Sequence, residues 1–166
     1  MQGNAPPNPP PLIEPMNPLQ ELNALTRAFP EEDPLFEHVE HVPAALLPDA
    51  YRKMLAHDHH MTVTMEAHYG CPVDVQVIEE HLDGDLYSRK ILLLKTGTDK
   101  VVQFGIVRFD FQYVTEQVRE EILEGQTPMG RVLINHNVLR HIDLGALLQF
   151  RAGKALADYL QMQPGE

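Results

Sequence analysis

Apolar side chains recur at helical spacing early in the chain and at alternate positions in its middle. Two short helices are predicted, one over residues 49–59 and one that follows Thr62 as a possible N-cap and ends at Gly70, a residue type that commonly follows the last residue of a helix. From Val73 the period changes to two, which predicts a strand, and an Asp-Gly turn then leads into predicted strands over 86–95 and 101–111. Strands joined by such short turns pair antiparallel, so the pattern predicts an antiparallel meander.

The rest of the chain predicts helices again, with one ambiguous stretch. Residues 114–124 are amphipathic and end at a glycine, and one helical turn is predicted over 131–135. Between residues 146 and 160 we favour a hairpin that turns at residues 151–154, and the alternative is a helix that begins at Lys154. Because the chain shows no parallel βαβ alternation, the predicted fold class is α+β, an antiparallel sheet with flanking helices.

Proline divides the chain into an arm and a folded domain. Nine of the 14 prolines lie in residues 1–34, and proline removes backbone donors and fixes φ, which disfavours regular structure. We therefore predict a proline-rich flexible arm over 1–34, with a short docking helix over 19–29, followed by one domain over 35–166. A simple tether is the favoured interpretation of the arm, and a ligand for a proline-recognition domain is the alternative.

Composition excludes several classes of function. The chain has 13 Lys and Arg against 24 Asp and Glu, a net charge of −11, which disfavours binding to nucleic acid. The apolar runs are too short for a membrane span, and no secretory leader is recognisable. The single cysteine, Cys71, cannot form an internal disulfide and is interpreted as a half-buried small residue. We expect a cytoplasmic protein, either a monomer or a homodimer.

Three local patterns could carry chemistry. The histidine-rich run 57–60 contains good zinc ligands, but neighbouring residues of a helix point apart, so a solvated helix end is favoured over a metal site. Arg89 shares a strand face with Tyr87 and Ile91, and it is either an ordinary solvent-facing arginine or a buried guanidinium that pairs with a carboxylate ligand. The turn at 127–131 (Thr-Pro-Met-Gly-Arg) either presents backbone N–H groups to an anion or simply starts a helix.

Taken in order, these patterns resemble the chorismate pyruvate-lyase family and its wider superfamily, which includes effector-binding domains of bacterial transcription regulators. Met61-Thr62 follows a predicted helix, and the stretch 88–93 (Ser-Arg-Lys-Ile-Leu-Leu) resembles the family's arginine-bearing strand. Residues 125–131 (Gly-Gln-Thr-Pro-Met-Gly-Arg) resemble its Gly-x-Thr-Pro-Leu-Gly-Arg turn. The resemblance covers roughly residues 46–140. It implies an antiparallel sheet whose flanking helices close over a buried aromatic-acid site.

The resemblance also implies roles for individual residues. Arg89 matches the arginine that pairs with the ligand carboxylate. Met61 and Met129 match positions that line the pocket, and Gly130 and Arg131 belong to the same turn. Arg131 either supplies further positive charge or, as we favour, braces the turn.

The implied reaction is the elimination of pyruvate from chorismate to give a hydroxybenzoate, without a cofactor or a metal. Lyases of the family use a glutamate that follows a Gly-Lys turn, and Gly153-Lys154 resembles this turn. The matching position here is Leu160, so Asp158, two residues earlier on the predicted strand, is the candidate catalytic acid. The alternative is a protein of the same fold that binds a small aromatic carboxylate without turning it over.

Overall fold

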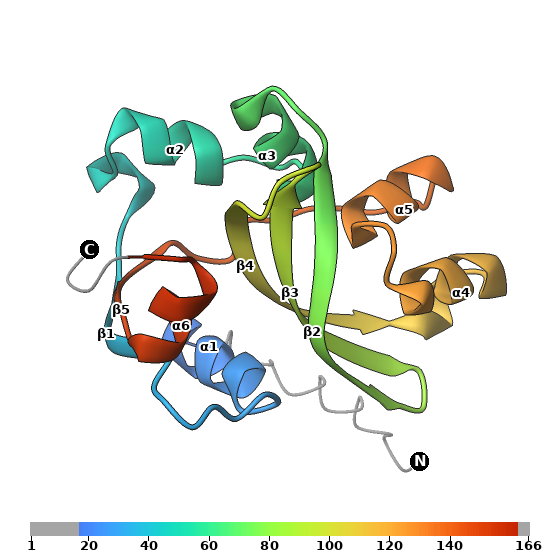
Figure 1. Ribbon diagram of the computed structural model, residues 1–166, viewed down its shortest axis with the longest axis horizontal. Helices are drawn as coiled ribbons and strands as arrows, with labels where there is room; N and C mark the ends of the chain where they lie inside the picture. Colours follow the sequence, from blue (N-terminus) through green and yellow to red (C-terminus); the bar gives the residue numbers. More distant parts are fainter. Residues whose placement is uncertain (1–16, 163–166) are drawn as a thin grey trace, which may run out of the picture.

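The computed structural model, which describes residues 17–162, has an α+β architecture with two antiparallel sheets (Figure 1). The central sheet has the strand order β2-β3-β4. Its strands are β2 (Val73–Asp83), β3 (Leu86–Lys95) and β4 (Val101–Asp110). A second sheet pairs β1 (Phe36–His41) with β5 (Leu148–Ala152). The predicted fold class and the antiparallel meander are confirmed.

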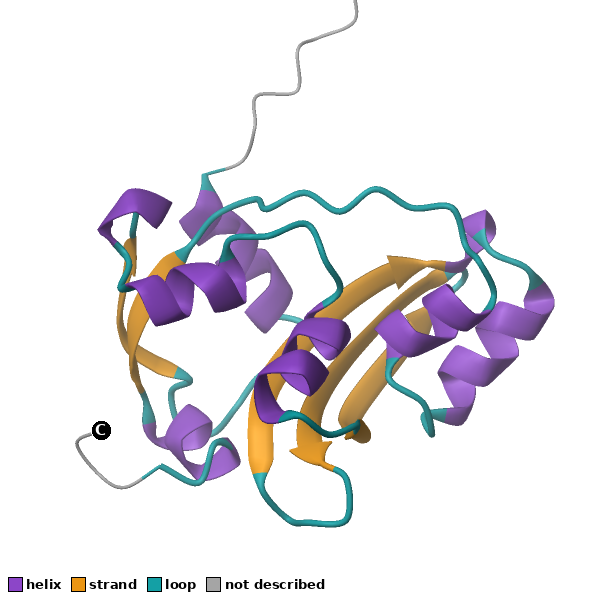
Figure 2. Ribbon diagram, turned by 90° about the horizontal axis from the view of Figure 1, so that it is seen from above, coloured by secondary structure: helices purple, strands orange, loops and turns teal. Residues whose placement is uncertain are grey.

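Six α-helices and two short 3-10 helices complete the described chain. The α-helices are α1 (Pro18–Thr26), α2 (Asp49–Leu55), α3 (Met61–Tyr69), α4 (Glu116–Glu124), α5 (Met129–Asn135) and α6 (Lys154–Tyr159). The 3-10 helices are η1 (Ala44–Leu46) and η2 (Phe111–Tyr113). Figure 2 shows helices on both sides of the central sheet. Among the described residues, no helix is both long and apolar enough to cross a bilayer.

The two faces of the central sheet bury different sets of side chains. One face carries Tyr87, Ile91 and Leu93 of β3, which pack with residues of α3, α4 and α5 into two apolar clusters. On the other side of the sheet, Phe104 of β4 packs against a smaller cluster that includes Leu156 of α6. Successive residues of a strand point to opposite faces, so Arg89 belongs to the first face and its neighbour Lys90 to the second.

Glycines define the boundaries that the sequence predicts correctly. Gly84 has a φ of 61° in the turn between β2 and β3. Gly70 and Gly125 end α3 and α4 in the left-handed conformation, with φ of 66° at both. A side chain makes this conformation unfavourable, which is why glycine marks helix ends so reliably.

The predicted hairpin over residues 146–160 is wrong, and the alternative helix from Lys154 is correct. Strand β5 pairs with β1, more than 100 residues earlier in the chain, instead of with the residues that follow it. The chain turns at Gly153, whose N–H donates to the carbonyl of Leu35 at 2.8 Å. A Cβ atom at this position would lie 2.1 Å from the carbonyl oxygen of Pro34, so only glycine allows this approach. Because the β1–β5 pairing is long-range, the local alternation could not reveal it.

The short helix predicted over 19–29 is present as α1, with Asn17 as its N-cap and a capping box to Gln20. After α1 the chain buries Phe29, whose ring stacks on His81 at 5.0 Å between centroids. The described part of the predicted arm therefore packs against the central sheet. The proline-rich stretch over residues 1–16 lies outside the described residues.

Candidate functional site

A cavity of about 350 Å³ lies on the face of the central sheet that carries Arg89. Its floor comes from alternate residues of neighbouring strands, and its walls come from the first residues of α3 and α5. The residues that line this cavity include Met61, Arg89, Gln103, Met129 and Gly130. The volume is at the lower end of the range for small-molecule pockets and is sufficient for a single aromatic ring with substituents.

Arg89 is the most buried charged residue of the described chain, with 1% of its surface exposed. Its Nη1 donates a long hydrogen bond of 3.4 Å to the carbonyl of Ile122 in α4. Its Nε atom is buried and has no hydrogen-bond partner, and within residues 17–162 no carboxylate forms an ion pair with this guanidinium. An unpaired buried cation is strongly unfavourable. Because only 1% of its surface is exposed, Arg89 is a buried arginine and not the solvent-facing one that the sequence left as an alternative.

The nearby acidic group, Glu80, is engaged by a tyrosine. The hydroxyl of Tyr87 donates to Oε2 of Glu80 at 2.5 Å. Burial and this hydrogen bond raise the pKa of Tyr87 to about 12, while the charge of Arg89 and a side-chain hydrogen bond with Arg89 act in the opposite direction. Tyr87 is thus a neutral donor at physiological pH, and it ties up the carboxylate that could otherwise approach Arg89.

Gln103 supplies a second unpaired polar atom to the cavity. Its Oε1 atom is buried without a hydrogen-bond partner. Gln103 lies opposite Leu93 in the β3–β4 ladder and therefore on the same sheet face as Arg89. Between the two, Gly105 lies opposite Ile91 and leaves the centre of the floor without a side chain. The sequence analysis did not single out Gln103, because strand alternation shows which face a residue lies on but not whether that face lines a cavity.

The walls of the cavity come from two helix N-termini in close contact. Met61 and Met129 are the first residues of α3 and α5, and neither helix has a side-chain cap. A Cβ atom added to Gly130 would lie 3.0 Å from Oγ1 of Thr62 and 3.1 Å from Cβ of His60, so glycine allows the two helix starts to meet. The structure thus brings Met61, Met129 and Gly130 together with Arg89.

Arg131 does not line the cavity. Its side chain forms an ion pair with Glu66 of α3. The pair joins α5 to α3 next to the cavity and holds the two walls together. This geometry agrees with the bracing role that the sequence analysis favoured.

Asp158 also lies away from the cavity, and the structural basis for its candidacy is wrong. It is a residue of the α6 helix, not of a strand, and its side chain is 70% exposed. Its carboxylate contacts Lys154 at 3.3 Å, one helical turn earlier. The strand geometry that would have brought Asp158 to the ring is absent because residues 154–159 are helical. The residues that line the cavity include no Asp or Glu.

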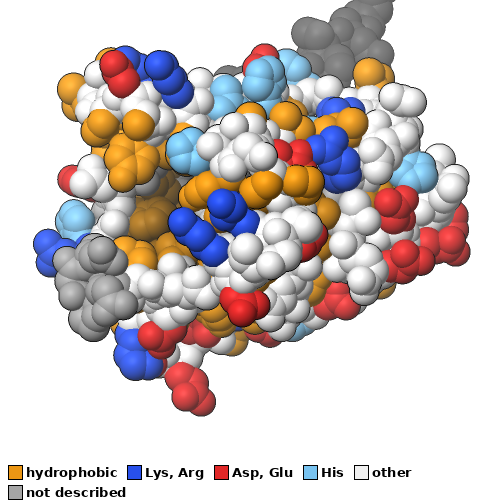
Figure 3. All heavy atoms as spheres, turned by 45° about the horizontal axis from the view of Figure 1, so that its top comes forward, with side chains coloured by type: hydrophobic (Ala, Val, Ile, Leu, Met, Phe, Trp, Pro, Cys, Tyr) orange, Lys and Arg blue, Asp and Glu red, His pale blue; other side chains and the backbone are white. Residues whose placement is uncertain are grey.

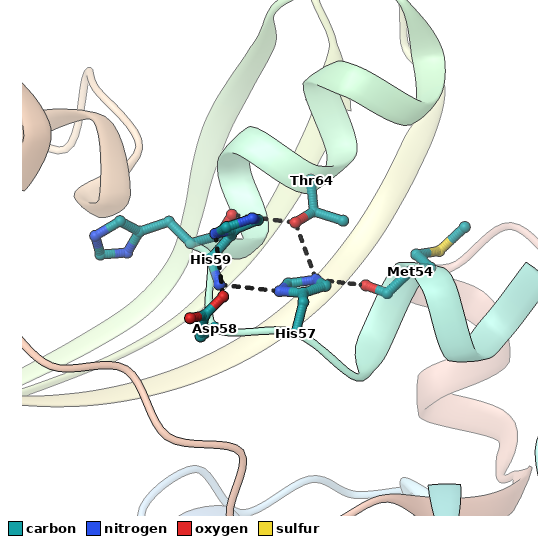
Figure 4. Close-up of polar contacts among 6 residues, drawn as sticks. Met54, His57, Asp58, His59 and Thr64 are labelled. Atoms are coloured by element: carbon teal, nitrogen blue, oxygen red, sulfur yellow. Dashed lines mark hydrogen bonds and ion pairs between the residues drawn. The ribbon is translucent and has the colours of Figure 1, made fainter. Parts of the chain in front are cut away.

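The histidine-rich run 57–60 connects α2 to α3, and its rings make local hydrogen bonds. Figure 4 shows the ring of His57 between the carbonyl of Met54, 2.7 Å away, and the hydroxyl of Thr64, 2.9 Å away. Its other ring nitrogen accepts from the backbone N–H of His59 at 3.1 Å. In the part of the chain that the structure describes, no group of three His, Cys, Asp or Glu side chains is placed to hold a metal ion.

His60 is the member of this run that reaches the cavity. Its Nε2 accepts a hydrogen bond from Nε of Arg140, which lies in the irregular segment 136–147. Burial and, to a smaller extent, the charge of Arg140 lower the pKa of the His60 imidazole. His60 is therefore neutral at physiological pH and presents a polar ring at the edge of the cavity.

Charge is distributed unevenly over the surface. On the face shown in Figure 3, Asp and Glu side chains gather along the lower and right edges, and hydrophobic side chains gather in a hollow. Against the net charge of −11, the guanidinium of Arg89 is a local positive charge in a shielded place. Such a site favours a small anion over a large polyanion, which the surface would repel.

Comparison of the sequence with protein-family models and with curated proteins finds no match.

Proposed function

We propose that this protein binds a small aromatic carboxylate in the cavity over Arg89. The observation that carries the proposal is the buried guanidinium of Arg89, whose Nε has no partner and with which no carboxylate of the described chain forms an ion pair. A ligand carboxylate provides what this group lacks, because it accepts charge-assisted hydrogen bonds in the planar geometry that a guanidinium presents.

The shape of the cavity supports a flat ring. Ile91, Leu93 and Val75 provide apolar surface on the sheet, and the two methionines at the helix starts provide it on the walls. Apolar walls with a few placed polar groups are the usual composition of a small-ligand site. An aromatic acid buries its ring against these side chains while its carboxylate reaches Arg89.

A second candidate function is elimination of pyruvate from chorismate in the same cavity, as the resemblance to chorismate pyruvate-lyases implies. In its favour, four residues matched through that resemblance, Met61, Arg89, Met129 and Gly130, line one cavity. Against it, Asp158 lies outside, and the lining residues provide no carboxylic acid. Binding without turnover is therefore the function that the geometry supports best. The cytoplasmic location, the monomeric or dimeric state and the membership of this superfamily remain predictions.

Calorimetric titration with 4-hydroxybenzoate tests the proposal. Wild type is expected to bind, and Arg89→Met is expected to lose roughly 10- to 150-fold in affinity, the range for a hydrogen bond to a charged group. Arg108→Met is the matched control, because Arg108 is an exposed arginine on the neighbouring strand β4. Equal affinities of wild type and Arg89→Met would contradict the proposal.

Incubation with chorismate separates the two candidate functions. Pyruvate release by wild type and by Arg108→Met, but not by Arg89→Met, would establish the lyase. Binding of 4-hydroxybenzoate without pyruvate release is the expected result and identifies a binding protein.

A further inference from the structure

We infer that Gln103 reads a hydroxyl group on the ring of the ligand, so that the cavity selects hydroxylated aromatic acids over unsubstituted ones. This inference rests on the proposed function, because it takes Arg89 as the site of the carboxylate. It adds a residue that determines specificity and narrows the ligand class to aromatic acids with a hydrogen-bonding substituent distant from the carboxylate.

The first observation is that the described part of the chain leaves two side-chain polar atoms buried and unpaired. They are Nε of Arg89 and Oε1 of Gln103, and both residues line the same cavity. Buried polar groups in folded proteins are nearly always hydrogen-bonded, so each such group requires an explanation. One ligand that accepts from Arg89 and donates to Gln103 satisfies both groups at once.

The second observation is their separation along the sheet. Gln103 lies opposite Leu93, and Arg89 is four residues from Leu93 on the same strand. At about 3.3 Å per residue, the two backbone positions are roughly 13 Å apart along the strands. Both residues line the cavity, so a ligand that contacts both must extend along the strands between them. A carboxylate and a hydroxyl at opposite ends of a ring fit this arrangement.

The third observation is the open floor between them. Ile91 and Gly105 form the pair halfway between Arg89 and Gln103. A Cβ atom on Gly105 would lie 3.3 Å from Cδ1 of Ile91 and 3.7 Å from Nε2 of Gln103, so any side chain there would occupy this space. The glycine leaves a flat surface on which a ring can rest between the two polar groups.

The hydroxyl is favoured over other substituents by the chemistry of the amide. Oε1 of Gln103 accepts, so it requires a donor on the ligand, and a hydroxyl provides one. A carboxylate at this end would face an acceptor without a cation. A methyl or hydrogen at this position would leave Oε1 unpaired, which is unfavourable in a buried site.

The experiment compares 4-hydroxybenzoate with benzoate by calorimetric titration of wild type and of Gln103→Leu. Wild type is expected to bind 4-hydroxybenzoate about fivefold more tightly than benzoate, the effect of one neutral hydrogen bond of ordinary strength. Gln103→Leu keeps the size of the side chain and removes the amide, so it should reduce this preference to less than twofold while benzoate affinity is retained. Gln76→Leu, at an exposed position of β2, is the control and should keep the wild-type preference.

The outcomes separate this inference from the proposed function. If wild type binds both acids and its preference is below twofold, or if Gln103→Leu keeps the full preference, the inference about Gln103 is overturned and the binding site over Arg89 stands. If wild type binds neither acid, the proposed function fails and the inference fails with it. The comparison within wild type gives a decision even if Gln103→Leu does not fold.

Discussion

Arg89 and Lys90 are adjacent buried residues of β3, but only the charge of Lys90 has ion-pair partners among the described residues. The ammonium of Lys90, on a side chain that is 3% exposed, contacts the carboxylates of Glu31 at 2.5 Å and Glu79 at 3.2 Å. The rings of Phe29 and Tyr159 also lie within 6 Å of it. Arg89, on the opposite face, has a long hydrogen bond to the carbonyl of Ile122 and forms no ion pair with a carboxylate of the described residues.

The pKa of Lys90 reflects this difference. Burial alone lowers the pKa of a lysine, but hydrogen bonds with Glu31, Glu79 and Tyr159 outweigh burial and raise it. The fold thus supplies the counter-charge for Lys90 and uses it to attach the segment after α1 to the sheet. Arg89 instead lines a cavity and has no ion-pair partner among the described residues. A buried cation that the protein satisfies belongs to the structure, whereas one left unsatisfied beside a cavity indicates a ligand site.

The largest expected effect is on stability when Lys90 is replaced. Lys90→Met leaves Glu31 and Glu79 without their cation and should lower the free energy of unfolding by about 2–4 kcal/mol, a range reduced because Glu79 is partly exposed. Arg89→Met removes a buried charge that has no ion-pair partner, so it should leave the free energy of unfolding unchanged or raise it. Urea denaturation followed by circular dichroism measures both. Equal losses of unfolding free energy in Lys90→Met and Arg89→Met would contradict the proposed difference between the two buried cations.

A smaller effect is expected when the two helix starts are pushed apart. Gly130→Ala places a Cβ atom 3.0 Å from Oγ1 of Thr62 and 3.1 Å from Cβ of His60, so these side chains or the start of α5 must move by a few tenths of an ångström. Overpacking of this kind destabilises by about 1–3 kcal/mol, and the affinity for 4-hydroxybenzoate should fall as the wall of the cavity moves. Gly145→Ala is the control, because a Cβ atom there meets nothing within 4 Å. An unchanged affinity in Gly130→Ala would show that this wall does not contribute to binding.

The smallest expected effect is a pH dependence that arises from His60. Its pKa is lowered in the folded state, so as pH falls below about 6.5 the unfolded chain takes up a proton first. Stability from this group is therefore complete above the unfolded pKa and declines as pH falls through 6.5 towards the folded pKa. Thermal unfolding between pH 7 and pH 5 should show a shallower decline in His60→Asn than in wild type. His141→Asn, at an exposed histidine, serves as the control, and identical slopes for His60→Asn and wild type would contradict the prediction.

The sequence predicts the central sheet well because its signals are local. Period-two alternation from Val73, the Asp-Gly turn at Gly84 and the helix-ending glycines at Gly70 and Gly125 each depend on a few neighbouring residues. The hairpin over residues 146–160 is wrong because Leu156 and Leu160 satisfy both an alternating and a helical pattern. What decides between the patterns is the contact of Gly153 with the backbone of Pro34, which is remote in sequence.

The candidate site is predicted in part for the same reason. Strand parity and the Thr-Pro-Met-Gly-Arg turn single out Arg89, Met129 and Gly130 as candidates, and the resemblance to the chorismate pyruvate-lyase family implies their roles in the site. Gln103 is missed because nothing local distinguishes a glutamine that faces a cavity from one that faces solvent. Asp158 is wrongly placed because its candidacy depends on the strand that forms a helix instead.

The most direct test of the role of Arg89 is the nuclear magnetic resonance signal of its Nε–H group, assigned by its absence in Arg89→Lys. Adding 4-hydroxybenzoate should move this resonance downfield and slow its exchange with water, because the unpaired Nε gains a carboxylate acceptor. The Nε–H of Arg108 should not respond. A signal of Arg89 that stays unchanged while the ligand is bound would contradict the claim that this guanidinium holds the ligand carboxylate.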